Sequence, residues 1–495
     1  MKDFITYFKE TAEIGYVQSI SSSLFYVNGL PNARINELIM TENGAIGIVR
    51  ALLPELVEAM VFEGQSLVHD MKVVRTNEFF QVPVSDLFLG RILDPFGITQ
   101  DHFEKIDPKS FVYRHIDAPA PIIAQRVRIT KPLVTGVMVV DILTPLGRGQ
   151  RELILGDPTV GKSALALQTI VSQARLGTVC IYTLIGKRKA DIKRVEEYLG
   201  HMNVLKSTVV IASSSSDPTP MIYLTPYTAM AIAEYFRDKG KDVLVVLDDL
   251  STHAKFYREL SLLSKRPPGR QSYPGDIFHV QAKIAERAGN VKLAGGKVAS
   301  ITLLPIAETQ EGDLSGYIQT NLMAMTDGHI FLDAHEQKKS RHPAVSLTLS
   351  VSRVGNQTVG DLERQIAYRL HQLIANARKA EELGRFGVEL APPTMELIRN
   401  SAKLETLFNQ DADVTFSKEL QLIYVGLFLS GYWSGKTVDE MAKDVEDIRV
   451  ASEQDKLDAL KLEIGRVSKL SEYLSIMESN HLKITKIVNG VKKQK

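Results

Sequence analysis

The sequence predicts a chain of three parts: an N-terminal β-barrel, a central α/β domain and a C-terminal α-helical region. Short β-type runs separated by turns fill residues 14–82. Apolar runs of strand length then alternate with helical segments over residues 83–360, as in a parallel α/β core. From residue 361 to 495 the strand-like runs stop and helical periodicity replaces them. Residues 1–13 are expected to form a short N-terminal tail.

Composition limits the classes of protein to consider. The 495 residues are 44% hydrophobic, enough for several domains with large cores. Lys and Arg number 59 against 58 Asp and Glu, so a net charge of +1 gives no electrostatic reason to expect nucleic acid as a partner. The single cysteine, Cys180, cannot form an internal disulfide, which favours a reducing cytoplasm. No apolar run approaches the ~20 residues that span a bilayer, so we expect no direct membrane insertion.

The first part is predicted to be a small barrel. Asn28-Gly29 and Asn43-Gly44 are the residue pairs that favour tight hairpin turns. Short strands at this spacing are typical of closed barrels. Strand spacing alone leaves an open sheet as the alternative.

The central part contains six candidate core strands. They are residues 153–155, 178–185, 208–212, 243–247, 298–304 and 329–332. Ligands of parallel α/β sheets bind at the carboxyl ends of the strands.

A phosphate-binding motif follows the first of these strands. The pattern G-x-x-x-x-G-K-[ST] is matched in full by Gly156, Asp157, Pro158, Thr159, Val160, Gly161, Lys162 and Ser163. A strand-like run precedes the motif and a helical run follows it, which favours a true phosphate-binding loop over a glycine-rich turn without a ligand. Lys162 offers a cation to the outer phosphates of a nucleotide, and Ser163 offers a hydroxyl to Mg²⁺.

Two carboxylates end the strand at 243–247. A nucleotide-hydrolysing P-loop protein needs an acid at such a strand end to help hold Mg²⁺. We assign that role to Asp248, partly through water, and expect Asp249 to cap a helix or form a structural pair.

Two cations bear on hydrolysis. Lys187 stands at the end of the strand after the P-loop helix, where a carboxylate or glutamine would position the attacking water. Because an ammonium has no acceptor, Lys187 argues against hydrolysis at this site. Arg353 follows another β-like run and can act on a γ-phosphate across a subunit boundary. A surface salt bridge is the alternative for Arg353.

The third part opens with an amphipathic stripe. It consists of Leu362, Ile366, Leu370, Leu373, Ile374 and Ala377 at helical spacing. We interpret the stripe as helix packing rather than a cofactor groove. The basic end, residues 492–495, is expected to be a solvated, frayed terminus.

These motifs resemble the alpha subunit of F-type ATP synthase from about residue 14 to the end of the helical region. The matching stretches are residues 134–163, 248–276, 308–313 and 350–355. The resemblance implies a β-barrel crown, a RecA-like nucleotide domain and a C-terminal helical bundle. It implies alternation with catalytic beta-type subunits in a hexamer around a gamma-type central stalk.

The resemblance also assigns roles. Alpha subunits bind ATP or ADP with Mg²⁺ without turning it over, and the arginine at the position of Arg353 reaches the neighbouring catalytic site. Lys187 stands where beta subunits carry glutamate and alpha subunits usually carry glutamine. The residues around the base correspond to His342, Pro343 and Gln410.

Several departures separate this chain from the family pattern. The loop interior usually reads Arg-Gln-Thr where this chain has Pro158-Thr159-Val160. His342 replaces an arginine, and Ala412 replaces the second glutamine near the base. Only about a dozen residues precede the barrel, which puts the usual peripheral-stalk contact in doubt.

Two alternatives therefore stay open. One is a paralogous F-type-like motor that uses ATP for motility or export. The other is a self-sufficient homohexameric export-type ATPase, against which Lys187 argues. In either form of the F-type assignment, partners would hold the chain at the inner face of the cell membrane.

Overall fold

The computed structural model describes residues 2–61, 67–385 and 391–492. The chain divides into two compact units. The first unit comprises Met1–Val127, Gly177–Thr309 and Asp313–Thr326, and the second comprises Arg128–Leu176, Gln310–Gly312 and Asp327–Lys495. The domain boundaries predicted from the sequence stay predictions. Most of the basic end, residues 493–495, lies outside the described residues.

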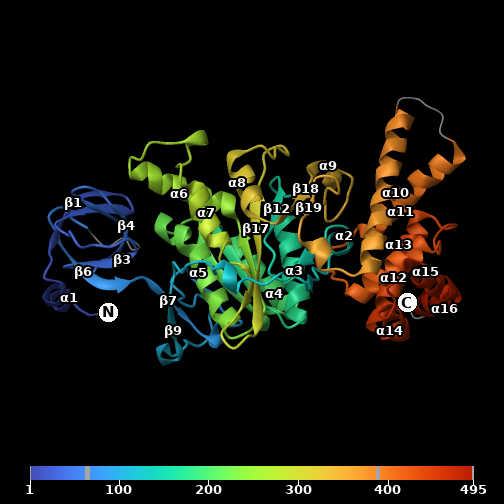
Figure 1. Cartoon of the computed structure of the whole chain (residues 1–495), viewed down its shortest axis with the longest axis horizontal. Helices are drawn as coiled ribbons and strands as arrows, with labels where there is room; N and C mark the ends of the chain where they lie inside the picture. Colours follow the sequence, from blue (N-terminus) through green and yellow to red (C-terminus); the bar gives the residue numbers. More distant parts are fainter. Residues whose placement is uncertain (1, 62–66, 386–390, 493–495) are drawn as a thin grey trace. The chain divides into compact units, whose positions relative to one another are not determined.

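The first unit begins with helix α1 (Phe4–Thr11) and a closed six-stranded barrel, drawn in dark blue in Figure 1. Its strands are β1 (Gly15–Ser21), β2 (Leu24–Asn28), β3 (Glu37–Thr41), β4 (Ile46–Leu52), β5 (Val57–Val61) and β6 (Lys72–Phe79). The order around the barrel is β1-β2-β5-β4-β3-β6, and antiparallel pairing of β1 with β6 closes it. The closed barrel is confirmed, and the open sheet is excluded.

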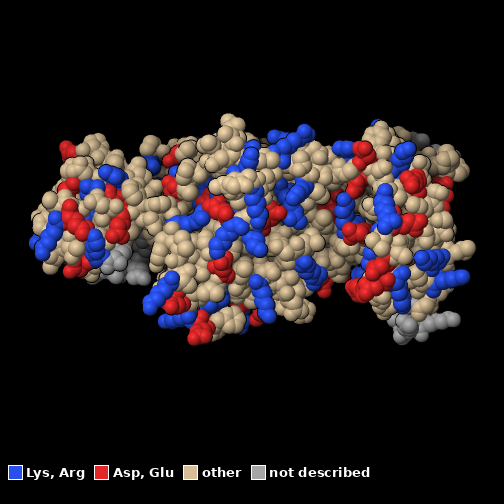
Figure 2. Space-filling model, turned by 60° about the horizontal axis from the view of Figure 1, so that its bottom comes forward, with Lys and Arg blue, Asp and Glu red and all other residues tan. Residues whose placement is uncertain are grey.

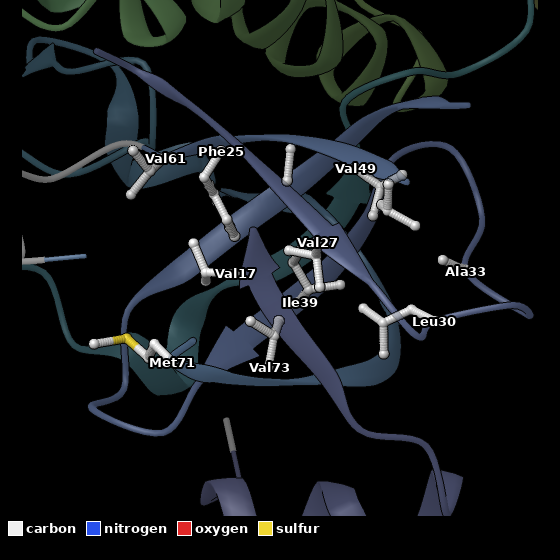
Figure 3. Close-up of a cluster of buried hydrophobic side chains, with 12 residues drawn as sticks. Val17, Phe25, Val27, Leu30, Ala33, Ile39, Val49, Val61, Met71 and Val73 are labelled. Carbon is white, nitrogen blue, oxygen red and sulfur yellow. The ribbon is translucent and has the colours of Figure 1, made fainter. Parts of the chain in front are cut away.

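The barrel is filled by apolar side chains that alternate along its strands. Figure 3 shows Val17, Val27, Ile39 and Val73 among the residues that meet inside, and all four are completely buried. Inward projection of every second side chain explains why each strand supplies part of this core.

One of the two predicted hairpin turns is confirmed. Asn43-Gly44 connects the paired strands β3 and β4. The prediction for Asn28-Gly29 was wrong, because β2 pairs with β1 and β5 and not with the strand that follows it. Gly29 still adopts a positive φ of 79°, so the local turn preference holds while the strand pairing is set by distant residues.

The remainder of the first unit contains a parallel sheet. Its strands run in the order β8-β14-β13-β15-β17, and β16 pairs antiparallel with β17. The strand bounds are β8 (Ile92–Leu93), β13 (Val179–Lys187), β14 (Thr208–Ser214), β15 (Val243–Asp248), β16 (Gly289–Lys292) and β17 (Val298–Glu308). The helices of this part are α4 (Lys189–His201), α5 (Thr219–Asp238), α6 (Leu250–Leu263), α7 (Ile277–Ala285) and α8 (Tyr317–Met325). A separate pair is formed by β7 (Gln81–Val84) and β9 (Val112–His115).

The second unit contains three further strands of the α/β region. Strand β12 (Glu152–Gly156) pairs parallel with β18 (Gly328–Leu332), which pairs antiparallel with β19 (Val351–Ser352). Strands β10 (Pro132–Leu133) and β11 (Leu146–Gly147) form a small pair. Helices α2 (Met138–Leu143), α3 (Lys162–Arg175) and α9 (Ala334–Lys338) accompany them. Each of the six predicted core strands coincides with a strand of the structure.

Helices make up the rest of the second unit, drawn in orange to red in Figure 1. They are α10 (Asp361–Arg385), α11 (Pro392–Phe408), α12 (Lys418–Leu429), α13 (Val438–Glu453), α14 (Asp458–Ile464), α15 (Leu470–Ser479) and α16 (His481–Lys492). Five residues of the predicted stripe on α10 are buried, and Leu373 is partly buried. The predicted fold class, with a barrel, an α/β region and a C-terminal helical region, is confirmed.

The surface carries both signs of charge. On the face shown in Figure 2, basic and acidic side chains are interspersed in small groups, as the net charge of +1 leads one to expect. Of the helices in the described residues, none combines the length and apolar character needed to cross a membrane.

Candidate functional site

The phosphate-loop motif lies between β12 and α3 of the second unit. Gly156 has a φ of 158°, and a Cβ on it would come within 2.6 Å of the Leu332 carbonyl oxygen. Gly161 has a φ of 102° and is the N-cap of α3. These two backbone positions require glycine, which explains their place in the motif. The strand–loop–helix context predicted from the sequence is confirmed.

The ammonium of Lys162 forms hydrogen bonds with the backbone of the loop itself. Lys162 Nζ donates to the carbonyl oxygens of Gly156 over 2.9 Å and Asp157 over 2.6 Å. Residues outside the loop also form hydrogen bonds with it. Asp157 Oδ1 accepts from Gly312 N at 3.0 Å. Gln337 Nε2 donates to the Thr159 carbonyl oxygen at 3.0 Å. The positive end of α3 and the Lys162 ammonium therefore share one anchored loop, an arrangement suited to an anion.

A cavity of about 40 Å³ in the second unit contains two of the predicted base-binding residues, His342 and Pro343. Its apolar walls are formed by Val139, Pro343, Val345, Leu347, Ile374, Leu404 and Phe408. Asn409 also lines it, and its Oδ1 accepts from His342 N at 2.6 Å. The cavity thus combines apolar walls with a few fixed polar groups.

An ion-paired group forms the polar side of this cavity. The Arg341 guanidinium bridges the carboxylates of Glu336 and Glu405. Burial raises the pKa of Glu405, and the nearby Arg341 charge opposes that rise. Sequence reasoning missed this group because nothing in the local pattern joins Glu405 on α11 to the segment before His342.

Gln410, the third residue assigned to the base, is placed differently. Its Nε2 donates to the carbonyl oxygens of Gly136 and Val414, both at 2.7 Å. Its Oε1 accepts from Met138 N at 3.1 Å, and the residue is buried. The side chain therefore connects backbone segments and does not line the cavity. A direct role of Gln410 at the base stays a prediction.

The acidic pair belongs to the first unit, at the end of β15. Lys187 Nζ lies 2.7 Å from Asp248 Oδ1 and 2.8 Å from Asp249 Oδ2. Tyr182 donates its hydroxyl to Asp248 Oδ2 at 2.8 Å. Asp249 is the N-cap of α6 and accepts from Thr252 N, so the structural role expected for it is confirmed.

Arg353 follows directly after β19 in the second unit. Its side chain is exposed, and its backbone N–H donates to the Asp327 carbonyl oxygen at 3.2 Å. In the described part of the chain, no carboxylate forms an ion pair with its guanidinium. Burial raises the pKa of the Glu152 carboxyl well above its ordinary value; the bond from Gln150 and the charge of Arg353 oppose that rise, and the charge of Asp327 adds to it. Arg353 thus presents a charge outward from a fixed strand end.

The described residues provide no ready-made metal centre. No group of three or more His, Cys, Asp or Glu side chains among residues 2–61, 67–385 and 391–492 could hold a metal ion. In nucleotide sites Mg²⁺ is usually held by one or two protein groups together with phosphate oxygens and water. Ser163 and Asp248 stay the predicted protein groups for it, and the ammonium of Lys187 already occupies one oxygen of Asp248.

Comparison with known proteins identifies the family. Residues 136–352 match the model of the ATP synthase alpha/beta family, nucleotide-binding domain. The ATP synthase subunit alpha of Dictyoglomus thermophilum is 39% identical over 437 residues, which cover 88% of this chain and 84% of that protein.

Two further alpha subunits extend the comparison. That of Aquifex aeolicus is 36% identical over 468 residues, or 93% of this chain and 91% of the relative. That of Mycoplasma genitalium is 37% identical over 433 residues, or 87% and 83% of the two chains. The chain belongs to the ATP synthase alpha/beta family, and within it to the alpha subunits.

Proposed function

We propose that this chain is the nucleotide-binding, non-catalytic subunit of an F-type-like rotary ATPase, and that its Arg353 serves the catalytic site of a neighbouring subunit. The observation that carries the non-catalytic assignment is the ion pair of Lys187 with Asp248 and Asp249. The exposed guanidinium of Arg353 supports the second part of the proposal.

Membership of the family implies that ATP or ADP binds to the chain. Lys162 and the first turn of α3 hold the phosphates, and the cavity beside His342 and Pro343 receives the base. Gly156 keeps the backbone close enough to β18 for the loop to curl around an anion. These groups bind and orient the nucleotide without needing to move a proton.

Hydrolysis needs a group that accepts a proton from water or orients it. The last residue of β13 is Lys187, whose ammonium has no acceptor. Burial lowers the pKa of Lys187, but the charges of Asp248 and Asp249 outweigh burial and raise the pKa above its ordinary value. The side chain therefore stays protonated at neutral pH and cannot act as a base.

Arg353 is suited to act outside its own subunit. A guanidinium that approaches a γ-phosphate from a neighbouring chain spreads the negative charge of the transition state. The β19 strand and the backbone bond to Asp327 fix the base of the side chain. The side chain is exposed and has no carboxylate partner in the described residues, so it can pair with a phosphate.

Beta-type catalytic subunits and a gamma-type stalk subunit are the partners that an alpha subunit implies. An adaptor or peripheral-stalk protein is a further proposed partner, as is a position at the inner face of the cell membrane held through partners. Ser163 is the hydroxyl we assign to Mg²⁺. A motor dedicated to motility or export is the second candidate, favoured by Pro158-Thr159-Val160 in place of the usual loop interior.

The purified chain tests the proposal directly. Titration with ATP in a calorimeter should reveal binding, and a phosphate-release assay on the same sample should find negligible turnover. Lys162→Ala should abolish the binding, because it removes the cation from the loop. Robust hydrolysis by the isolated wild-type chain would refute the non-catalytic assignment.

A further inference from the structure

The segment that carries Arg353 is attached to the rest of the second unit on both sides of the arginine. The Arg353 N–H donates to the Asp327 carbonyl oxygen at 3.2 Å, and Ser352 before it is the last residue of β19. After it, Gly355 lies so close to Pro145 that a Cβ on the glycine would collide with the proline carbonyl oxygen. The backbone of Arg353 is therefore fixed, although its side chain is exposed.

A buried glutamine connects this segment to the residues just before β12. Gln150 is completely buried, and its Nε2 donates to Ser352 Oγ at 3.1 Å and to Glu152 Oε2 at 2.7 Å. Its Oε1 accepts from Gly147 N at 2.8 Å. Both amide hydrogens and the amide oxygen of Gln150 thus have partners, which fixes the orientation of the carboxamide.

The Ser352 hydroxyl joins these contacts to Arg353. Its Oγ donates to the Pro145 carbonyl oxygen at 2.7 Å and accepts from Gln150 Nε2 and, at 3.2 Å, from Gly355 N. A hydroxyl has one hydrogen and two lone pairs, so each of its hydrogen-bonding positions is used. Because Ser352 directly precedes Arg353, a shift of this hydroxyl would move the backbone from which the guanidinium extends.

We propose that Gln150 is a positioning residue for Arg353, and that it keeps the guanidinium aligned with the γ-phosphate in a neighbouring catalytic site. The inference rests on the proposed role of Arg353. Gln150 is buried, so it acts through Ser352 and does not itself reach a phosphate. Alignment matters because a misplacement of about 1 Å in a group that acts on a transition state can lower the rate about 10²-fold.

The experiment measures ATP hydrolysis by the reconstituted ring with Gln150→Met, which keeps the length of the side chain and removes its amide. We expect kcat to fall about tenfold or more. The KM for ATP should stay within about threefold of the wild type, because the guanidinium acts on the transition state more than on bound ATP. ATP binding to the isolated variant should be unchanged.

Gln421→Met is the matched control. This glutamine is also buried, and its Nε2 donates to Asp141 Oδ2 at 2.8 Å and to the Phe416 carbonyl oxygen at 3.2 Å. Its substitution removes a comparable buried amide whose partners do not belong to the segment of Arg353. Thermal melting shows whether each variant is folded, and the folded control should support full ring activity.

A double variant separates positioning from a general weakening of the structure. If Gln150 acts only through Arg353, Gln150→Met should add no loss to a ring that already carries Arg353→Ala, and the two rates should agree within about twofold. A further loss of about tenfold in the double variant overturns the positioning role, because the effect of Gln150 would then be independent of Arg353.

The outcomes also separate the inference from the proposed function. Full ring activity of a folded Gln150→Met overturns the inference, while a collapse with Arg353→Ala keeps the proposed role of the arginine. If Gln150→Met does not fold, Ser352→Ala removes the same link, and an unchanged kcat in that variant overturns the inference as well. Full activity of the Arg353→Ala ring refutes the proposed function, and the inference falls with it.

Discussion

The carboxamide of Gln410 donates to the Gly136 carbonyl oxygen over 2.7 Å, across a separation of 274 residues in the sequence. The same nitrogen reaches the Val414 carbonyl oxygen, and the carboxamide oxygen accepts from Met138 N. One buried side chain therefore ties the start of α2 to the segment that follows α11. This geometry gives Gln410 a structural role whether or not a nucleotide is bound.

Gln410→Ala should destabilise the chain by about 2 kcal/mol, because it removes three hydrogen bonds and leaves the buried Met138 N–H without this acceptor. Urea denaturation measures the loss, and calorimetry should find ATP affinity within about threefold of the wild type. Gln372→Ala on the exposed face of α10 is the control and should leave stability unchanged. Normal stability with tenfold weaker ATP binding would instead make Gln410 a base-recognition residue.

The contrast between the phosphate loop and Gln410 explains what could be predicted from the sequence. The loop is a local structure: a strand, glycines with required φ angles and a helix start within about twenty residues. The partners of Gln410 lie on segments whose approach depends on the folding of the whole unit. The ion pairs of Arg341 with Glu336 and Glu405 also join segments that are distant in the sequence, so no local pattern predicts them.

Helix α1 is a secondary-structure element that likewise could not be predicted from local sequence, because it depends on contacts with distant residues. The sequence predicts only a tail for residues 1–13, and a helix of eight residues is too short to be stable without tertiary contacts. In the structure Tyr7 is completely buried against Met40 and Val74 of the barrel, and Asp3 caps the helix. The six core strands, by contrast, were predictable because long apolar runs bounded by turns need no distant partner to be recognised.

Lys187→Glu should produce no hydrolysis in the isolated chain, although it introduces a carboxylate that could accept a proton from water. The new carboxylate would lie between Asp248 and Asp249, where two buried negative charges already need a cation. We expect a loss of stability of about 3 kcal/mol or more, larger than that of Lys187→Gln. Phosphate release and thermal melting test both points, and substantial new turnover would contradict them.

His253 makes stability depend on pH. Burial lowers the pKa of its imidazole from 6.5 to about 4, while the backbone bond to Tyr223 and the charge of Asp249 oppose that shift. The unfolded chain takes up a proton below about pH 6.5 and the folded chain does not until about pH 4, so this contribution to stability is lost as the pH falls through that window. The loss should reach about 3 kcal/mol.

The measurement compares the wild type with His253→Gln, which has no group to titrate there. Their difference in free energy of unfolding should shift by about 3 kcal/mol between pH 7 and pH 4. The variant comparison is needed because Asp141 acts in the opposite direction: burial raises the pKa of its carboxyl to about 6, so its contribution weakens as the pH rises towards 6. Exposed His279→Gln is the control, and a constant difference for His253→Gln would contradict the assignment.

Arg353→Ala should reduce ATP hydrolysis by the reconstituted ring about 10³-fold, because the transition state in the neighbouring site loses its guanidinium. ATP binding to the isolated variant should stay unchanged, since Arg353 lies outside the loop of Lys162 and the cavity of His342. Arg353→Lys should restore little of the activity, because an ammonium cannot bridge two phosphate oxygens as a planar guanidinium does. Arg364→Ala, an exposed arginine paired with Asp361 on its own helix, is the matched control and should support full ring activity. An unchanged ring rate for Arg353→Ala would remove the proposed role and leave the residue as part of the surface.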